Sequence, residues 1–254
     1  MKKYARLTGL GAISLSAGLW ATAGMTAESE PELNISLGLG TGYSESIYKG
    51  IDDDTAALPL FDIEYGNFYI SGLEAGYTYY ETETLSLYAA IAADDLDGER
   101  TDSRQLRDLG DVDSGTNLVL GAEMMTEVGM LSASIAQDVA DEHKGTQVNL
   151  EWGVPVEFGD LTVLPAVSAS WVSDKLVNHY YGVSASEARV GRAAYDGDSA
   201  WIYGVGVAAE YALNQEWTII GAVNYEHYSD EITDSSIVSE DSAVSAMMGV
   251  RYQF

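Results

Sequence analysis

The chain of 254 residues contains no cysteine, so disulfide bonds, thiolate metal ligands and cysteine nucleophiles are excluded. Basic side chains are scarce as well, with 12 Lys and Arg against 40 Asp and Glu and a net charge of −28. A chain this acidic is repelled by phosphate backbones. Nucleic acid is therefore excluded as a partner, and the acidity indicates solvated loops or loops that collect cations.

Residues 1–27 have the pattern of a secretory signal peptide. Basic residues precede an apolar run over residues 7–20, and small residues follow it. The basic residues are Lys2, Lys3 and Arg6. Polar residues interrupt the run, which is too short for a membrane anchor. Cleavage after Ala23 or after Ala27 fits the pattern, and residues 28–254 are expected to form the folded protein.

No later stretch has the length of a membrane-spanning helix, and apolar residues instead alternate with small or polar residues at a period of two. In a bilayer such strands must close into a barrel, because every backbone group needs a hydrogen-bond partner. The clearest strands are expected at 33–40, 148–158, 161–171, 201–213, 217–226 and 244–254, and weaker candidates at 56–65, 67–79, 84–93, 115–126 and 128–138.

These eleven segments conflict with the even strand number of single-chain bacterial barrels, and the miscount must lie before residue 84. The predicted fold is all-β: a transmembrane antiparallel β-barrel of ten or twelve strands, with twelve favoured. Long connections are expected at 94–113, 174–198 and 229–241 on the outside, and short turns in the periplasm.

Tryptophans support the barrel over a soluble β-sandwich, which would also alternate. Trp152, Trp171, Trp201 and Trp217 fall on the apolar face, where rings settle at the membrane interface. A sandwich would bury that face and carry more lysine on the other. The predicted location is the cell outer membrane, in contact with its lipid.

The candidate catalytic groups are weak. His143, His179 and His227 lie in predicted loops or at strand rims, with no spacing typical of a metal site. His227 lies beside Glu226 and Asp230 and is the one candidate base for a rim-active hydrolase. Such proximity is expected by chance in so acidic a chain. The sequence therefore predicts no enzyme, no catalytic residue, no dedicated metal site and no cofactor.

Two acidic runs and one glycine-rich run resemble ligand-binding motifs but do not complete them. Asp52-Asp53-Asp54 and Asp95-Leu96-Asp97-Gly98-Glu99 do not complete a calcium loop, so they predict weak divalent-cation binding at most. Gly38-Leu39-Gly40-Thr41-Gly42 is not followed by a helix, so inward glycines of a narrow barrel explain it better than a phosphate site.

A set of charged residues shares the polar face of the predicted strands. The set is Glu74, Glu123, Glu151, Glu210, Glu226 and Arg251. A lumen lined in this way either forms a hydrogen-bonded ionic plug or favours cations. The interior of a ten- or twelve-stranded barrel is narrow, so a mostly occluded barrel is expected, with a small cation-preferring pore as the alternative.

The C-terminal strand ends as outer-membrane barrels do. Met248, Val250, Tyr252 and Phe254 form its apolar face, and we expect them to carry the barrel-assembly signal.

Several segments, in the same order along the chain, resemble the MipA/OmpV family of outer-membrane proteins. The segments are Leu106-Arg107-Asp108-Leu109-Gly110-Asp111-Val112-Asp113, Tyr180-Tyr181-Gly182-Val183 with Glu187 and Ala188, Asp234-Ser235-Ser236-Ile237-Val238, and Gly249-Val250-Arg251-Tyr252-Gln253-Phe254. Ser236 stands where the family usually has proline, so the shape of that loop is not carried over.

The resemblance covers most of the chain after residue 27 and implies a non-enzymatic outer-membrane barrel. In some members of this family it implies scaffolding of murein-synthesising and murein-degrading enzymes, and in others osmotic response or adhesion. Scaffolding requires surface on the periplasmic side, where the predicted topology offers only short turns and the acidic residues 28–32.

Overall fold

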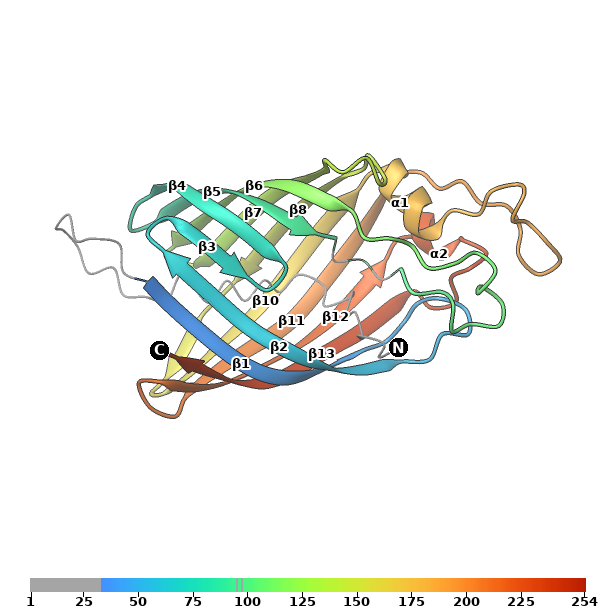
Figure 1. The fold of residues 1–254 in the computed structure, drawn as a ribbon. Coiled ribbons are helices and arrows are strands. Elements are labelled where there is room, and N and C mark those ends of the chain that lie inside the picture. Colours follow the sequence, from blue (N-terminus) through green and yellow to red (C-terminus); the bar gives the residue numbers. More distant parts are fainter. Residues whose placement is uncertain (1–32, 95, 97) are drawn as a thin grey trace.

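The computed structural model describes residues 33–94, 96 and 98–254, in which antiparallel strands form one sheet that closes into a barrel (Figure 1). The expected signal peptide lies outside these residues. The strands are β1 (Leu33–Ser44), β2 (Asp54–Tyr65), β3 (Phe68–Ser71), β4 (Glu74–Glu81), β5 (Leu85–Ala93), β6 (Thr116–Thr126), β7 (Gly129–Asp138), β8 (Thr146–Gly153), β9 (Val156–Phe158), β10 (Leu161–Val172), β11 (Ala200–Ala212), β12 (Trp217–Tyr228) and β13 (Ser242–Gln253).

The barrel has twelve strands, because β8 and β9 are two parts of one crossing that both pair with β10. Pro155 separates the two parts, as expected for a residue without a backbone N–H. The pairing of β1 with β13 closes the sheet. The favoured count of twelve is confirmed. The predicted single strand at 67–79 was wrong, because the chain turns back at Gly72, with φ +53°, and divides it into β3 and β4.

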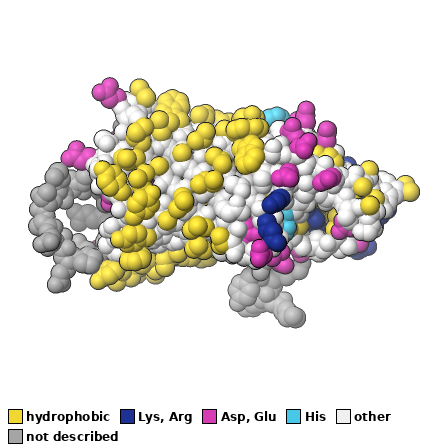
Figure 2. All heavy atoms as spheres, turned by 90° about the horizontal axis from the view of Figure 1, so that it is seen from above, with side chains coloured by type: hydrophobic (Ala, Val, Ile, Leu, Met, Phe, Trp, Pro, Cys, Tyr) yellow, Lys and Arg dark blue, Asp and Glu magenta, His cyan; other side chains and the backbone are white. Residues whose placement is uncertain are grey.

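The barrel wall carries its large apolar side chains outside, unlike a water-soluble domain. Leu39 and Met248 remain 67% and 63% exposed, and apolar side chains cover the body of the barrel (Figure 2). Trp171 and Trp201 lie opposite one another on β10 and β11, while Trp152 and Trp217 lie near the other rim. Lipid is the solvent that makes such a surface stable.

The two ends of the barrel differ. At the end that we call the turn end, consecutive strands connect through two to four residues, for example at 66–67 and 127–128. At the opposite end, called the loop end, the connections are longer, and two of them contain α1 (Asp174–Tyr181) and α2 (Asp230–Thr233); the β3–β4 hairpin turns back at 72–73, before it reaches that end. Neither of these helices is long and apolar enough to cross a membrane. Outer-membrane barrels direct their longer loops outward.

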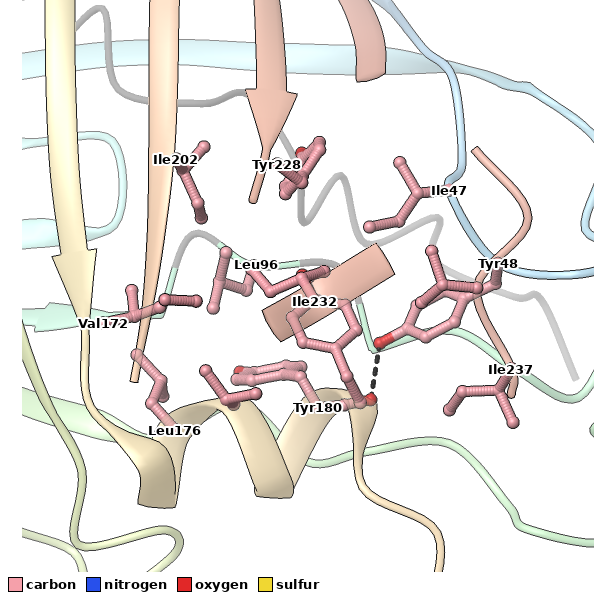
Figure 3. Close-up of a cluster of buried hydrophobic side chains, with 14 of the residues drawn as sticks. Ile47, Tyr48, Leu96, Val172, Leu176, Tyr180, Ile202, Tyr228, Ile232 and Ile237 are labelled. Atoms are coloured by element: carbon pink, nitrogen blue, oxygen red, sulfur yellow. Dashed lines mark hydrogen bonds between the residues drawn. The ribbon is translucent and has the colours of Figure 1, made fainter. Parts of the chain in front are cut away.

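The hydrophobic core of the protein lies at the loop end rather than along the wall. We call it the cap core (Figure 3). Its buried members come from α1, α2, the tops of β10 to β13 and the long connections. They are Ile47, Tyr48, Leu96, Leu106, Val172, Leu176, Val177, Tyr180, Tyr181, Val183, Ala200, Ile202, Tyr228, Ile232, Ile237, Val238 and Ala243. Because side chains from opposite sides of the rim meet there, the cap core spans the mouth of the barrel.

Candidate functional site

The C-terminal end of α1 accepts hydrogen bonds from several of the connections that form the cap. A helix leaves its last four carbonyl groups without helical partners. Here the Asn178 carbonyl accepts the Gly182 N–H (3.0 Å), and the His179 carbonyl accepts Arg100 Nη2 (3.3 Å). The other two carbonyls also have partners, so the last turn of the helix is fully satisfied.

The partners of those two carbonyls come from distant parts of the chain. The Tyr180 carbonyl accepts the Tyr48 hydroxyl (2.9 Å, dashed in Figure 3) and Arg100 Nη2. The Tyr181 carbonyl accepts the Ser235 hydroxyl at 2.6 Å. Three connections, β1–β2, β5–β6 and β12–β13, therefore dock onto one helix end. A Cβ atom at Gly182 would collide with the Asn178 carbonyl oxygen, which explains the glycine that follows the helix.

An ion pair joins Asp108, in one of the segments that carry the family resemblance, to Arg192, four residues after another of them. Arg192 Nη1 and Nη2 lie 3.0 and 2.8 Å from the two carboxylate oxygens of Asp108, which is the bidentate geometry of strong arginine pairs. Arg189 adds a second cation at 3.1 Å. The hydrogen bond from Arg192 is the main reason why the pKa of Asp108 falls to about 2.

The connection from α1 to β11 is held in place by the same arginine. Arg192 Nε donates to the Glu187 carbonyl (3.0 Å), and the Glu187 carboxylate accepts the Ser184 N–H (2.8 Å). Ala188 N–H also donates to the Ser184 carbonyl at 3.1 Å. Glu187 and Ala188 thus shape a turn, and Val183 pairs with Tyr195 across its base.

A buried polar cluster lies between the cap core and the lumen. The Asp94 carboxylate accepts the Tyr180 hydroxyl (2.7 Å), the Asn117 amide (2.5 Å) and the Gly115 N–H (2.8 Å). His143 Nε2 lies 3.1 Å from Asp94, and its Nδ1 accepts the Gly145 N–H at 2.9 Å. Both ring nitrogens of His143 face protein groups, which suits a structural role better than that of a general base.

The structure brings His143 and His179 together, with ring centroids 5.3 Å apart, which the sequence did not predict. His227 and Glu226 are neighbours on β12, so their side chains point to opposite faces of the sheet. Glu226 accepts the Tyr228 hydroxyl at 2.9 Å, and His227 is exposed. The geometry therefore gives no support to a pairing of His227 with Glu226, and Asp230 begins α2.

The predicted charged residues of the lumen occupy three places. Arg251 lies 3.3 Å from Glu210 and 3.6 Å from Asp62, a partner that the sequence did not single out. Glu74, Glu123 and Glu151 line a luminal cavity of about 240 Å³, together with Asp94. Glu226 lies outside this cavity lining, near the loop end of β12, where it accepts the Tyr228 hydroxyl.

The acidic runs and the glycines have structural surroundings. Asp53 accepts the Tyr43 hydroxyl at 2.8 Å, whereas Asp95 and Asp97 lie outside the described residues. Among the residues described, no group of three or more Asp, Glu or His could hold a metal ion. A Cβ atom at Gly38 or Gly40 would collide with the backbone of β13. These glycines therefore allow close packing where the barrel closes.

The predicted assembly residues lie on that same closing strand. Met248 is 63% and Phe254 72% exposed on the lipid side, and Tyr252 packs between the rings of Trp217 (4.9 Å) and Phe254 (4.8 Å). The Phe254 N–H donates to the Ile35 carbonyl at 3.0 Å, so the last residue completes the seam.

Charge is distributed unequally between the two ends. Of the Lys and Arg residues in the described part of the chain, Arg251 alone lies inside the barrel, and all others lie at the loop end; they are Lys49, Arg100, Arg104, Arg107, Lys144, Lys175, Arg189 and Arg192. The turn end exposes Glu81, Glu83, Glu127, Glu157, Asp160 and Glu216. In the part of the chain that the structure describes, the charged side chains of the turn end are thus all acidic.

Comparisons with known proteins agree with this architecture. The MltA-interacting protein of Escherichia coli (strain K12) is 31% identical over 239 residues, which cover 93% of this chain and 96% of that protein. YiaT of the same organism is 28% identical over 239 residues, with the same coverage. Outer membrane protein OmpV of Vibrio cholerae is 29% identical over 140 residues, 54% of each chain. The family model of the MltA-interacting protein MipA matches residues 37–254, and the chain therefore belongs to this family of outer-membrane barrels.

Proposed function

We propose that this barrel anchors a periplasmic murein-remodelling enzyme at the outer membrane, and that the partner docks on the turn end. The observation that carries the proposal is the uniformly acidic turn end, with six exposed carboxylates and no Lys or Arg among the described residues of that face. The name of the Escherichia coli relative, which records an interaction with MltA, supports the same role.

Electrostatic attraction by the carboxylates of the turn end compensates for the small contact area of the short turns. A face of one sign attracts a partner of opposite sign and raises the association rate, and this effect falls with ionic strength. The turns are short, so they add little contact surface beyond the rim itself. We therefore infer that the partner presents a basic face and that the complex is salt-sensitive.

Site-specific photocrosslinking in intact envelopes tests the proposal. A photoreactive residue at Gln215, in the turn between β11 and β12, is expected to capture a murein enzyme identified by mass spectrometry. The same residue at Val190, which is fully exposed in the β10–β11 connection, is expected to capture none. Capture from Val190 alone would contradict docking on the turn end.

Charge neutralisation tests the mechanism with a matched control. Glu83→Gln, Glu127→Gln and Asp160→Asn together remove three turn-end charges. Association with the captured enzyme should slow about tenfold at low salt. The control combines Glu142→Gln, Asp196→Asn and Glu240→Gln, which removes three exposed charges from the loop end and should leave the rate unchanged. Equal slowing by both sets would refute a role for the acidic face.

A further inference from the structure

The wall of the barrel is incomplete beside β2 on its loop-end half. β2 pairs with β1 along its whole length, from Asp54 to Tyr65, but with β3 only from Asp62 to Tyr65. β3 has four residues, and the chain then turns back at Gly72 and Leu73. Residues 54–61 therefore have no described strand on that side. We call this gap in the sheet the notch.

Pro59 is a residue that suits the unpaired edge of β2 at the notch. The Phe61 carbonyl accepts the Gly72 N–H at 3.2 Å, so the backbone groups of Phe61 point toward β3. Residues two apart on a strand direct their backbone groups to the same side. The nitrogen of Pro59 thus faces the notch, where it removes one donor that would otherwise be unpaired. Proline at an open edge also opposes pairing with another chain.

The luminal cavity adjoins the notch. Its lining includes Ser71, Leu73 and Glu74, which form the tip of the β3–β4 hairpin, and it extends across the barrel to β10. Leu73 is 71% exposed and also lines the cavity. The tip of this short hairpin is therefore the threshold between the bilayer and the cavity.

The cavity wall is acidic and rich in hydroxyl groups. Register places Glu123, Ser132, Glu151 and Ser168 side by side on the neighbouring strands β6, β7, β8 and β10. Among the lining residues are four carboxylates, including Asp94 and Glu74, and no Lys or Arg. Such a row of alternating acceptors and hydroxyls complements a protonated amine that carries further hydrogen-bonding groups.

The cap core covers the loop end of the barrel, whereas the hairpin tip beside the notch lines the cavity directly. We propose that this cavity is a binding site for the head group of a cationic amphiphile, which enters sideways from the outer leaflet through the notch, over Leu73. The hydrocarbon tail stays in the bilayer against the apolar wall. This inference is independent of the proposed enzyme partner.

Photolabelling in phosphatidylcholine nanodiscs tests the proposal. The probes are a dodecyl primary amine and a dodecyl carboxylic acid, each with a diazirine next to its head group. The amine is expected to label the cavity-lining side chains of β5 to β8 and the acid only lipid-facing side chains, with each labelled residue located by tandem mass spectrometry. Glu123→Gln with Glu151→Gln should lower cavity labelling by the amine about tenfold. Glu81→Gln with Glu157→Gln, on the exposed turn end, should not lower it.

The entry route has its own pair of variants. Leu73→Trp should fill the threshold and lower cavity labelling. Ile135→Trp, on the lipid face of β7, should not. A heat-dependent shift in gel mobility verifies that each variant is folded. Equal cavity labelling by both probes, or labelling that ignores the glutamate substitutions, would overturn the site. Labelling that depends on the glutamates but not on Leu73→Trp would overturn entry through the notch.

Discussion

The cap core and the barrel wall use the same kinds of apolar side chain in opposite ways. In the cap core, Tyr180 and Val172 have no exposed surface, as in a water-soluble protein. On the wall, Leu39 is 67% and Met248 63% exposed, and lipid replaces protein as their neighbour. The comparison teaches that hydrophobicity alone does not locate the core of this protein. Periodicity distinguishes the wall, whereas contacts between distant segments create the cap.

Truncation in the cap core should have the largest effect. Tyr180→Ala removes a fully buried ring and the hydroxyl that Asp94 accepts, and should destabilise the cap by about 3–5 kcal/mol. The barrel should remain folded, because its hydrogen bonds close within the sheet. Protease cleavage at the loop end, measured in vesicles beside gel mobility, should rise in this variant. Tyr180→Phe keeps the ring, and protease should cleave it much more slowly than Tyr180→Ala.

The same variant tests whether the cap closes the mouth. In planar bilayers the wild-type protein should conduct weakly and Tyr180→Ala more strongly, with cations preferred because glutamates dominate the lumen. A large anion-selective current in either protein would contradict the proposed influence of these glutamates.

Arginine substitutions at two exposed apolar residues distinguish the lipid-facing wall from the water-facing connections. Leu39→Arg, at the middle of β1, should destabilise the barrel by about 2–4 kcal/mol, because arginine at the bilayer midplane is costly. Val190→Arg alters a side chain that is even more exposed, in the connection before β11, and should change stability by less than about 0.5 kcal/mol. Urea unfolding in lipid vesicles measures both. Equal effects would mean that Leu39 does not face lipid.

Acidification should give the smallest effect, confined to the cap. Asp108 has a pKa of about 2 in the folded protein, against about 3.9 in an unfolded chain. Its lowered pKa stabilises the cap above about pH 4, and this contribution is lost as the pH falls toward 2. Asp108→Asn should lack that part of the pH dependence, as followed by protease cleavage between pH 5 and 2. If cleavage of the variant and of the wild type depends on pH in the same way, ionisation of Asp108 does not stabilise the cap.

The sequence predicted the wall well, because a strand with one face in lipid repeats every two residues over its whole length. The three long connections and the outward tryptophans depend on that period. The period alone gave eleven segments, and the even strand number of such barrels raised the expectation to ten or twelve, with twelve favoured. The division of 67–79 was missed, although the apolar face changes from even positions (Phe68, Ile70) to odd positions (Leu73, Tyr77) at Gly72, and this change of phase was a usable signal. The helical spacing of Leu176, Val177, Tyr180 and Tyr181 was a usable signal for α1 within a stretch predicted as a loop.

The cap and the polar cluster could not be predicted by local reasoning. Asp94 and Tyr180 are 86 positions apart, and Asp108 and Arg192 are 84 apart. No local period connects such residues, and family resemblance alone marked most of these segments. The structure shows what these segments do: 180–183 and 234–238 meet at the satisfied end of α1, 106–113 carries Asp108, and 249–254 closes the barrel.

Tryptophan quenching tests most directly whether the side chains of the wall face lipid and those of the cap core are buried within the protein. The four tryptophans after residue 28 lie on the wall, and a version with Tyr180→Trp in which these four are phenylalanine reports on the cap core. In nanodiscs containing brominated phospholipid, the wall tryptophans should be strongly quenched and the cap tryptophan should not. Strong quenching of the wall tryptophans by aqueous acrylamide, with none by brominated lipid, would contradict the account.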